Sequence, residues 1–213
     1  MPKVAILICI TEGDDGSSGC LEECQRQVDS IASEGRYSFS IFLGEEGENG
    51  RQAAWEKASA SEPDFFLWID HDLKLSEGAL ACLLENSEFL RHKAVVTGTV
   101  SDNDRNLIFG GRTRRGRLIE PDPVIPVPCQ LFDLDLVLVP SVAFSSLENP
   151  AYFFRQDLMY YGFGRRLAEA GVPRMVAPGI LAVTDRRIDN PSWRDPDITM
   201  KEKLVRLAHS LFK

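Results

Sequence analysis

The chain has 213 residues, of which 44% are hydrophobic and 26% charged, and these proportions are ordinary for a globular protein that buries a full core. Its net charge of −8 argues against a general nucleic-acid-binding protein, because a phosphate backbone requires a basic surface on its partner. No apolar run approaches the roughly 20 residues that a membrane-spanning helix needs, so we expect a soluble protein.

The cysteines and the N-terminus indicate a cytoplasmic protein. The sequence contains 5 cysteines, and none of them forms a C-x-x-C pair. An odd number without metal-ligand spacing predicts reduced, structural thiols. The first residues lead directly into a strand-like run that is too short for a signal peptide.

In the first half of the chain, apolar runs alternate with segments of helical periodicity. We expect strands over 4–10, 37–43, 65–69 and 95–100, and helices over 20–33, 51–60 and 76–86. The segments 11–19 and 44–50 are rich in glycine and acidic residues and predict loops, and Ser76 is the expected N-cap of the third helix. This alternation predicts an α/β sheet with helices on both faces.

The second half is less regular. Residues 107–119 resemble a hairpin whose turn carries four arginines, and the proline-rich segment 121–128 is expected to be irregular or at a sheet edge. Strands are expected over 134–139 and 176–184, a helix over 157–170, and a loop over 185–197. A basic amphipathic helix over 198–213 would pack on the domain or touch a membrane surface. We predict one domain over residues 1–213.

The run 65–72 (FFLWIDHD) is the strongest functional signal. It combines a buried strand with Asp70 and Asp72 directly at its end, and ligands bind beyond the carboxyl ends of such strands. Two carboxylates there suit Mg²⁺ or Mn²⁺ with a phosphate-containing substrate. The alternative is that the two acids only cap the following helix, with the His71 ring turned away into packing.

A second motif precedes this strand. The segment 49–58 (NGRQAAWEKA) opens a helix with Asn49, Gly50 and Arg51, followed by small residues. Such a helix can pack closely on a sheet, and its N-terminus favours an anion.

Together, these motifs resemble the family 2 glycosyltransferases of the GT-A fold, with the closest similarity to the bacterial rhamnosyltransferase-like branch. Later segments agree in order: Phe109-Gly110-Gly111, Leu138-Val139-Pro140, Asp157, and the run from Gly162 to Gly171. The resemblance implies a three-layer α/β/α fold with a central, mostly parallel sheet. It also implies a nucleotide-binding half over about 1–100 and an acceptor-binding half over about 101–197.

The resemblance further implies roles for individual residues. Asp70 and Asp72 would hold Mn²⁺ or Mg²⁺ and the diphosphate of a UDP-, GDP- or dTDP-sugar. Asp157 would be the general base of an inverting transfer to a saccharide or lipid-linked acceptor. The nucleotide would lie against the ends of the first two strands and the start of the 51–60 helix, at Thr11, Glu12, Glu45, Asn49 and Arg51.

Several positions depart from the family pattern and keep alternatives open. Asp133 and Asp135 stand where the family has an Asn-Gly pair, and Glu45-Glu46 replaces aspartates. Arg186 would contact the diphosphate and Asp185 would complete the metal shell, unless both belong to a surface loop. Gly110, Gly111 and the arginine-rich turn are candidate contacts to the diphosphate or to an anionic acceptor. A nucleotidyltransferase, or a GT-A-like domain without catalysis, are the alternative functions.

Overall fold

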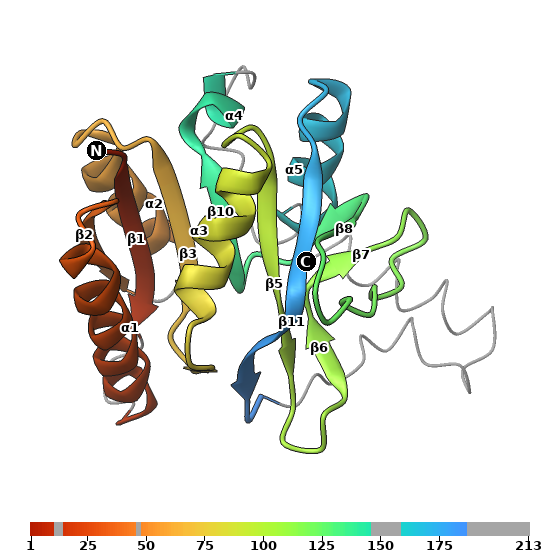
Figure 1. The fold of residues 1–213 in the computed structure, drawn as a ribbon, viewed down its shortest axis with the longest axis horizontal. Coiled ribbons are helices and arrows are strands. Elements are labelled where there is room, and N and C mark those ends of the chain that lie inside the picture. The colour runs from red at the N-terminus through yellow and green to blue at the C-terminus, as the bar shows by residue number, and fades with distance from the viewer. Residues whose placement is uncertain (11–14, 46–47, 146–158, 187–213) are drawn as a thin grey trace.

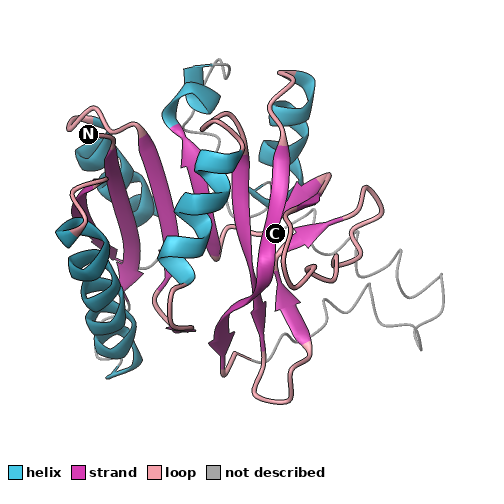
Figure 2. Cartoon of the chain, in the orientation of Figure 1, coloured by secondary structure: helices cyan, strands magenta, loops and turns pink. Residues whose placement is uncertain are grey.

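A computed structural model describes residues 1–10, 15–45, 48–145 and 159–186 of the chain. Within this part, a nine-stranded mixed sheet lies between two layers of helices (Figure 1, Figure 2). The main path of the sheet runs in the order β2-β1-β3-β10-β5-β11-β4.

The centre of the sheet is mostly parallel. Five strands run in one direction: β1 (Lys3–Ile10), β2 (Ser38–Glu45), β3 (Phe65–Asp70), β5 (Val95–Ser101) and β11 (Arg174–Thr184). The strand β10 (Leu136–Pro140) lies between β3 and β5 and is antiparallel to both. As a result, the amino end of β10 lies beside the carboxyl ends of its parallel neighbours.

Short strands complete the structure. β4 (Leu73–Leu75) and β8 (Val127–Pro128) pair antiparallel with β11, and β6 (Leu107–Phe109) pairs antiparallel with β5. A separate two-stranded sheet joins β7 (Gly111–Arg112) to β9 (Leu131–Phe132).

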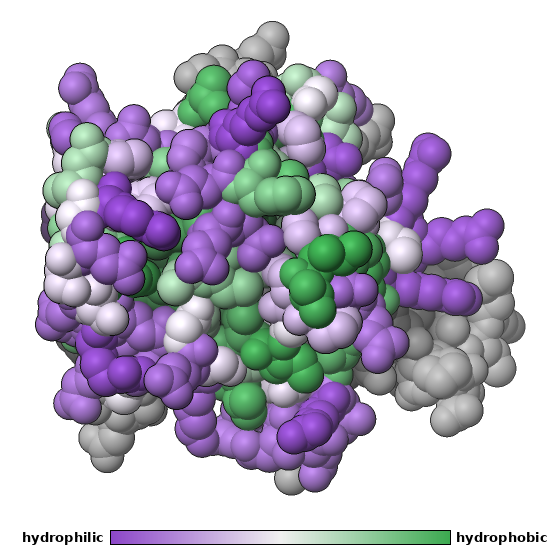
Figure 3. Space-filling model, in the orientation of Figure 1, coloured by the Kyte–Doolittle hydropathy of each residue, from purple (hydrophilic) through white to green (hydrophobic). Residues whose placement is uncertain are grey.

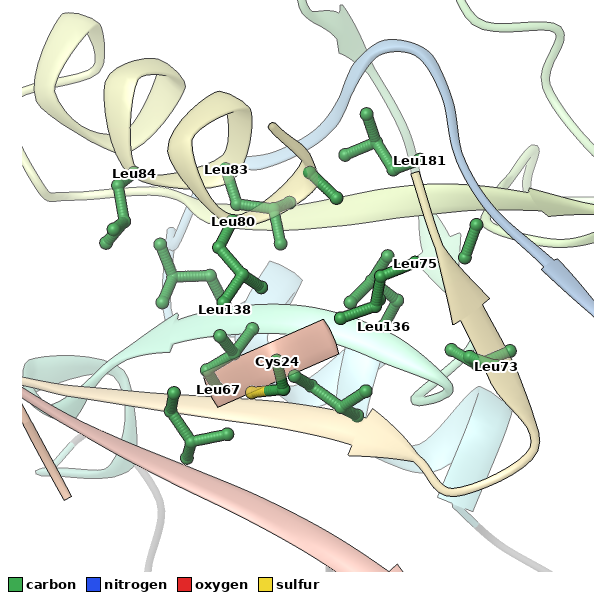
Figure 4. Close-up of a cluster of buried hydrophobic side chains, with 14 of the residues drawn as sticks. Cys24, Leu67, Leu73, Leu75, Leu80, Leu83, Leu84, Leu136, Leu138 and Leu181 are labelled. Atoms are coloured by element: carbon green, nitrogen blue, oxygen red, sulfur yellow. The ribbon is translucent and has the colours of Figure 1, made fainter. Parts of the chain in front are cut away.

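Helices α1 (Asp15–Ser33) and α3 (Ala79–Phe89) cover one face of the sheet. Both bury residues at helical spacing, and Figure 4 shows Leu80, Leu83 and Leu84 of α3 pointing toward the leucines of β3 and β10. The other face is covered by α2 (Glu48–Ser59), α4 (Ser141–Ser145) and α5 (Met159–Glu169). Because successive side chains of β3 point to opposite faces, its apolar run serves both layers.

The expected strands over 4–10, 37–43, 65–69, 95–100, 134–139 and 176–184 are confirmed, with shifts of one to two residues at most ends. Helix boundaries are less accurate. The structure begins α1 at Asp15, inside the expected loop, and α2 at Glu48, before the expected Arg51.

The predicted N-cap of α3 is wrong. The helix begins at Ala79, and Gly78 caps it in a left-handed conformation that glycine adopts at low cost. The hydroxyl of Ser76 instead donates to the carbonyl of Ile180, 3.3 Å away. Ser76 therefore joins the end of β4 to β11, a strand pair that the sequence did not predict.

The expected hairpin over 107–119 is present only in part. Its first arm contains β6 and β7, which pair with β5 and β9, and a single bridge joins Arg112 to Leu118 in the second arm. The turn between them is closed by the N–H of Thr113, which donates to the carbonyl of Arg117. The segment 121–128 is irregular apart from β8, as predicted. The expected terminal helix 198–213 lies outside the described residues.

Most of the surface in Figure 3 is hydrophilic, with hydrophobic side chains in smaller areas between polar ones. The largest exposed apolar side chains of the described segments include Phe89, Val124, Ile125 and Val142. Among the described helices, none combines the length and the apolar character needed to cross a bilayer. Four cysteines in the described part are free thiols, namely Cys20, Cys24, Cys82 and Cys129.

Candidate functional site

The site lies where the central strands end. Asp70 is the last residue of β3, and Asp135 directly precedes β10. The antiparallel register pairs Leu136 with Ile69, and the N–H of Asp70 donates to the carbonyl of Asp135 at 2.8 Å. The topology therefore places two aspartates, one from each strand, at the same edge of the sheet.

The turn after β3 brings Asp72 to the same place. The Oδ1 atom of Asp70 accepts the N–H of His71 at 2.9 Å and lies 3.0 Å from the Nδ1 atom of the same histidine. The imidazole ring therefore lies against the Asp70 carboxylate and not away from it, which corrects the alternative in which it turns into packing. The Oδ2 atom of Asp72 accepts the hydroxyl of Thr184, at the end of β11, at 2.9 Å.

Arg186 joins these acids. Its Nε and Nη2 atoms donate to the two oxygens of Asp72 at 2.9 and 2.7 Å. Nη2 also donates to Asp70 Oδ2 at 2.8 Å, and Nη1 donates to Asp135 Oδ1 at 3.0 Å. The guanidinium carbon lies 5.2 Å from the centre of the Phe109 ring, within range of a cation–π interaction. One guanidinium thus contacts three carboxylates from two segments of the chain, the triplet after β3 and the residue before β10.

The charges in this cluster influence one another. Burial raises the pKa of Asp135 well above its ordinary value, and the neighbouring Asp70 and Asp133 raise it further. Burial alone would lower the pKa of Arg186, but Asp70, Asp135 and Asp72 raise it above the ordinary arginine value. The Oδ2 atom of Asp135 is buried and has no hydrogen-bond partner among the described residues. The acids therefore outnumber the cation that holds them together.

A second buried ion pair lies beside the first. The Nε atom of Arg112 lies 2.9 and 2.8 Å from the two carboxylate oxygens of Asp133, and its Nη2 lies 2.7 Å from Oδ2. Only 13% of the arginine side chain and 4% of the aspartate side chain are exposed. The N–H of Gly110 donates to the same carboxylate at 3.1 Å. Arg112 is therefore a buried structural partner of Asp133 and not part of a solvated tip, although Arg114, Arg115 and Arg117 of the turn are exposed.

The structure separates the remaining predicted residues. Asp185 faces away from the acid cluster, because its carboxylate accepts from Lys74 Nζ at 2.6 Å and Asn103 Nδ2 at 2.5 Å. These two hydrogen bonds lower the pKa of Asp185. Gly111 packs so closely that an added Cβ would lie 2.2 Å from Val176 Cγ2. Gly110 and Gly111 are both buried.

Other predicted residues are placed only in part. Glu45 is the last residue of β2, and Asn49 and Arg51 lie in the first turns of α2, so their backbones are at the expected edge of the sheet. Thr11, Glu12 and Asp157 lie outside the described residues, and α5 begins two residues after Asp157, at Met159. The roles of all six stay predictions.

The donor set of the D-x-D triplet suits a hard divalent cation. Carboxylate oxygens are preferred ligands of Mg²⁺ and Mn²⁺. In the segments that the structure describes, no three His, Cys, Asp or Glu side chains are arranged as a metal site. Asp70 Oδ2 and Asp72 Oδ1 converge instead on one nitrogen, Nη2 of Arg186. The two acids fit a divalent cation chemically, and the guanidinium stands where that cation would bind.

No family model matches the sequence, and no curated protein does. The solved structures with a similar fold include the following two. A197 from STIV matches with a TM-score of 0.57 and 12% identity over 88% of this chain and 87% of its own. GalNAc-T7, crystallised with UDP, GalNAc and Mn²⁺, matches with a TM-score of 0.57 and 11% identity over 98% of this chain. The match spans 48% of the GalNAc-T7 chain, about half its length.

At these identities the similarity shows the fold alone. It confirms the predicted class, an α/β/α GT-A-like fold with a central, mostly parallel sheet. It gives no support at the level of family 2 or of the rhamnosyltransferase-like branch, which stay predictions.

Proposed function

We propose that this protein is a glycosyltransferase that moves a sugar from a nucleotide-diphosphate donor to a hydroxyl of a saccharide or lipid-linked acceptor. The observation that carries the proposal is the position of Asp70 and Asp72 at the carboxyl end of β3 in a GT-A-like sheet. GalNAc-T7, which shares this fold, was crystallised with UDP and Mn²⁺. The free thiols of Cys20, Cys24, Cys82 and Cys129 support a place in the cytoplasm.

In this proposal Asp70 and Asp72 hold Mn²⁺ or Mg²⁺ together with the donor diphosphate. The metal, when bound, supplies positive charge that stabilises the diphosphate as it leaves the sugar. Glu45, Asn49 and Arg51, with Thr11 and Glu12, line the nucleotide side of the site. The donor is a UDP-, GDP- or dTDP-sugar.

Asp157 is the proposed general base. It takes the proton of the acceptor hydroxyl while that oxygen forms a bond to the anomeric carbon, and the bond from that carbon to the diphosphate breaks. This direct displacement inverts the configuration of the sugar. The support is the resemblance of the segment around Asp157 to the family 2 pattern.

Calorimetric titration tests the donor half of the site. UDP, GDP and dTDP are titrated into the full chain with and without Mn²⁺, and one of them should bind only in the presence of the metal. Asp72→Asn should abolish this binding. Asp185→Asn is the matched control, because that carboxylate faces Lys74 and Asn103 and should leave binding unchanged. The proposal fails if none of the three nucleotides shows metal-dependent binding.

A domain without catalysis is the second candidate. It is favoured by the contact of Arg186 with Asp70, Asp72 and Asp135, which already partly neutralises the acids. Hydrolysis of the bound sugar nucleotide separates the two functions. An active transferase should release free sugar slowly, and Asp157→Asn should lower that rate, whereas a binding domain should show the same background with both proteins.

A further inference from the structure

We propose that Arg186 is a displaceable internal counter-ion: it occupies the cation position of the Asp70–Asp72 pair in the resting protein and moves to the donor diphosphate when a divalent cation binds. This inference rests on the function proposed above. In this inference Arg186 partly neutralises Asp70 and Asp72 before a metal ion binds and contacts the diphosphate leaving group afterwards.

Arg186 has little capacity to bind phosphate where it lies. All three nitrogens of its guanidinium donate to carboxylates, at 2.7 to 3.0 Å. Arginine recognises phosphate best through two parallel N–H groups on one edge of its guanidinium, and carboxylates occupy both such edges of Arg186. To contact a diphosphate in this way, the guanidinium has to leave at least one of the acids.

The acids around Arg186 are in excess. Asp70 and Asp72 alone place two carboxylates against one guanidinium, so a diphosphate that enters this arrangement meets more negative than positive charge. Asp135 adds a buried oxygen that has no hydrogen-bond partner in the described part of the chain. A second cation is needed before an anionic donor is held here, and a divalent ion supplies it.

Asp70 and Asp72 are also held in place by groups other than Arg186. Asp70 Oδ1 is held by the backbone of His71, and Asp72 Oδ2 by the hydroxyl of Thr184. The two oxygens that meet Nη2 of Arg186 are the other pair, Asp70 Oδ2 and Asp72 Oδ1. These two oxygens keep their direction when the guanidinium departs, and they present a ready pair of ligands to a metal ion.

The side chain of Arg186 is free to change partners. Its side chain is 33% exposed, whereas that of Asp135 is 3% exposed. The backbone N–H of Arg186 donates to Thr184 Oγ1 at 3.0 Å, so the main chain is fixed at the end of β11. A long side chain on a fixed backbone can exchange one anionic partner for another by rotation about its own bonds.

Binding of Mn²⁺ alone, without nucleotide, tests the inference. Removing the competing cation with Arg186→Gln should tighten Mn²⁺ binding to the full chain about tenfold or more, since charged hydrogen bonds no longer have to be broken. The same variant should bind UDP more weakly at saturating Mn²⁺, because the diphosphate loses its arginine. Arg105→Gln removes an exposed arginine in the turn after β5 and should change neither affinity by more than about twofold.

A further variant covers the case in which Arg186→Gln does not fold, which circular dichroism would show. Arg186→Lys keeps the charge but contacts fewer oxygens at once, so its Mn²⁺ affinity should lie above that of the natural protein. The inference is overturned if the folded Gln variant, or the Lys variant in its place, binds Mn²⁺ no more tightly than the natural protein.

The outcomes also separate this inference from the proposed function. If Arg186→Gln gains Mn²⁺ affinity but no nucleoside diphosphate binds the natural protein, the counter-ion role stands and the glycosyltransferase proposal falls. If the natural protein binds UDP with Mn²⁺ but the variant gains no Mn²⁺ affinity, the transferase stands and the counter-ion role is wrong. In that case Arg186 is a fixed structural partner of the acids.

Discussion

Replacing Arg112 by methionine should destabilise the protein strongly, although the residue lies in a turn rich in arginine. The side chain is 13% exposed and its partner Asp133 is 4% exposed, with nitrogen–oxygen distances of 2.7 to 2.9 Å. Removing one partner of a buried ion pair leaves an uncompensated charge and costs about 3 to 5 kcal/mol. Because a domain has only about 5 to 15 kcal/mol of unfolding free energy in total, this loss is large.

Urea unfolding of the natural protein, Arg112→Met, Asp133→Asn and the double variant measures the effect. The double variant should cost less than the sum of the two single ones by about 1 to 3 kcal/mol, since the two residues contact each other directly. Arg115→Met makes the same change at an exposed position of the same turn and should stay within about 0.5 kcal/mol of the natural protein. Equal, small losses for Arg112→Met and Arg115→Met would refute the reasoning and return Arg112 to the solvent-exposed cluster.

Three further predictions concern a buried acid, a close contact and the thiols. The raised pKa of Asp135 means that its carboxyl group binds a proton more tightly in the folded protein than in the unfolded chain. The protonated Asp135 therefore contributes most to the free energy of unfolding at low pH, and this contribution is lost as the pH rises above 3.8, the ordinary pKa of the group. Urea unfolding over a pH series should show Asp135→Asn gaining stability relative to the natural protein with rising pH, and a pH-independent difference would contradict this. Gly44→Ala would place a Cβ 2.7 Å from the carbonyl oxygen of Gly50 in α2. We expect this crowding to lower the free energy of unfolding by about 1 to 3 kcal/mol, measured by thermal or urea unfolding. An unchanged unfolding midpoint would contradict this. Burial raises the pKa of the thiols of Cys20, Cys24 and Cys129 to about 12. Ellman's reagent near pH 8 should therefore label these thiols only after unfolding. Rapid labelling of the native protein would contradict this prediction.

The sequence predicted the central strands well because most of them are largely apolar runs of strand length that both faces of a sheet can bury. The run 65–69 is the clearest example, and the acids at its end lie where the pattern placed them. β4 escaped prediction because it has three residues and follows the D-x-D triplet directly. The start of α3 was misplaced because Ser76, a common N-cap residue, makes its hydrogen bond to Ile180 across the sheet.

The candidate site was predicted in part. Asp70, Asp72 and Arg186 were singled out, but their direct contact was not, because Arg186 is 114 to 116 residues away in sequence and is brought to the two acids only by the sheet. Asp135 appeared only as a departure from a family pattern. A signal for it was present: the run 131–136 (LFDLDL) alternates acids with apolar residues at the start of a buried strand, where an acid needs a partner. The antiparallel insertion of β10 between β3 and β5 could not be derived from local periodicity.

That insertion has a consequence for how the chain folds. Asp70 and Asp135 are brought together by the pairing of β3 with β10, whereas Arg186 follows β11, the last strand of the sheet. An intermediate in which β11 has not yet docked would therefore hold facing aspartates without their guanidinium, and their mutual repulsion would oppose closure of that edge of the sheet. Docking of the last strand supplies the missing positive charge. The acid cluster thereby links the completion of the described sheet to the arrival of β11.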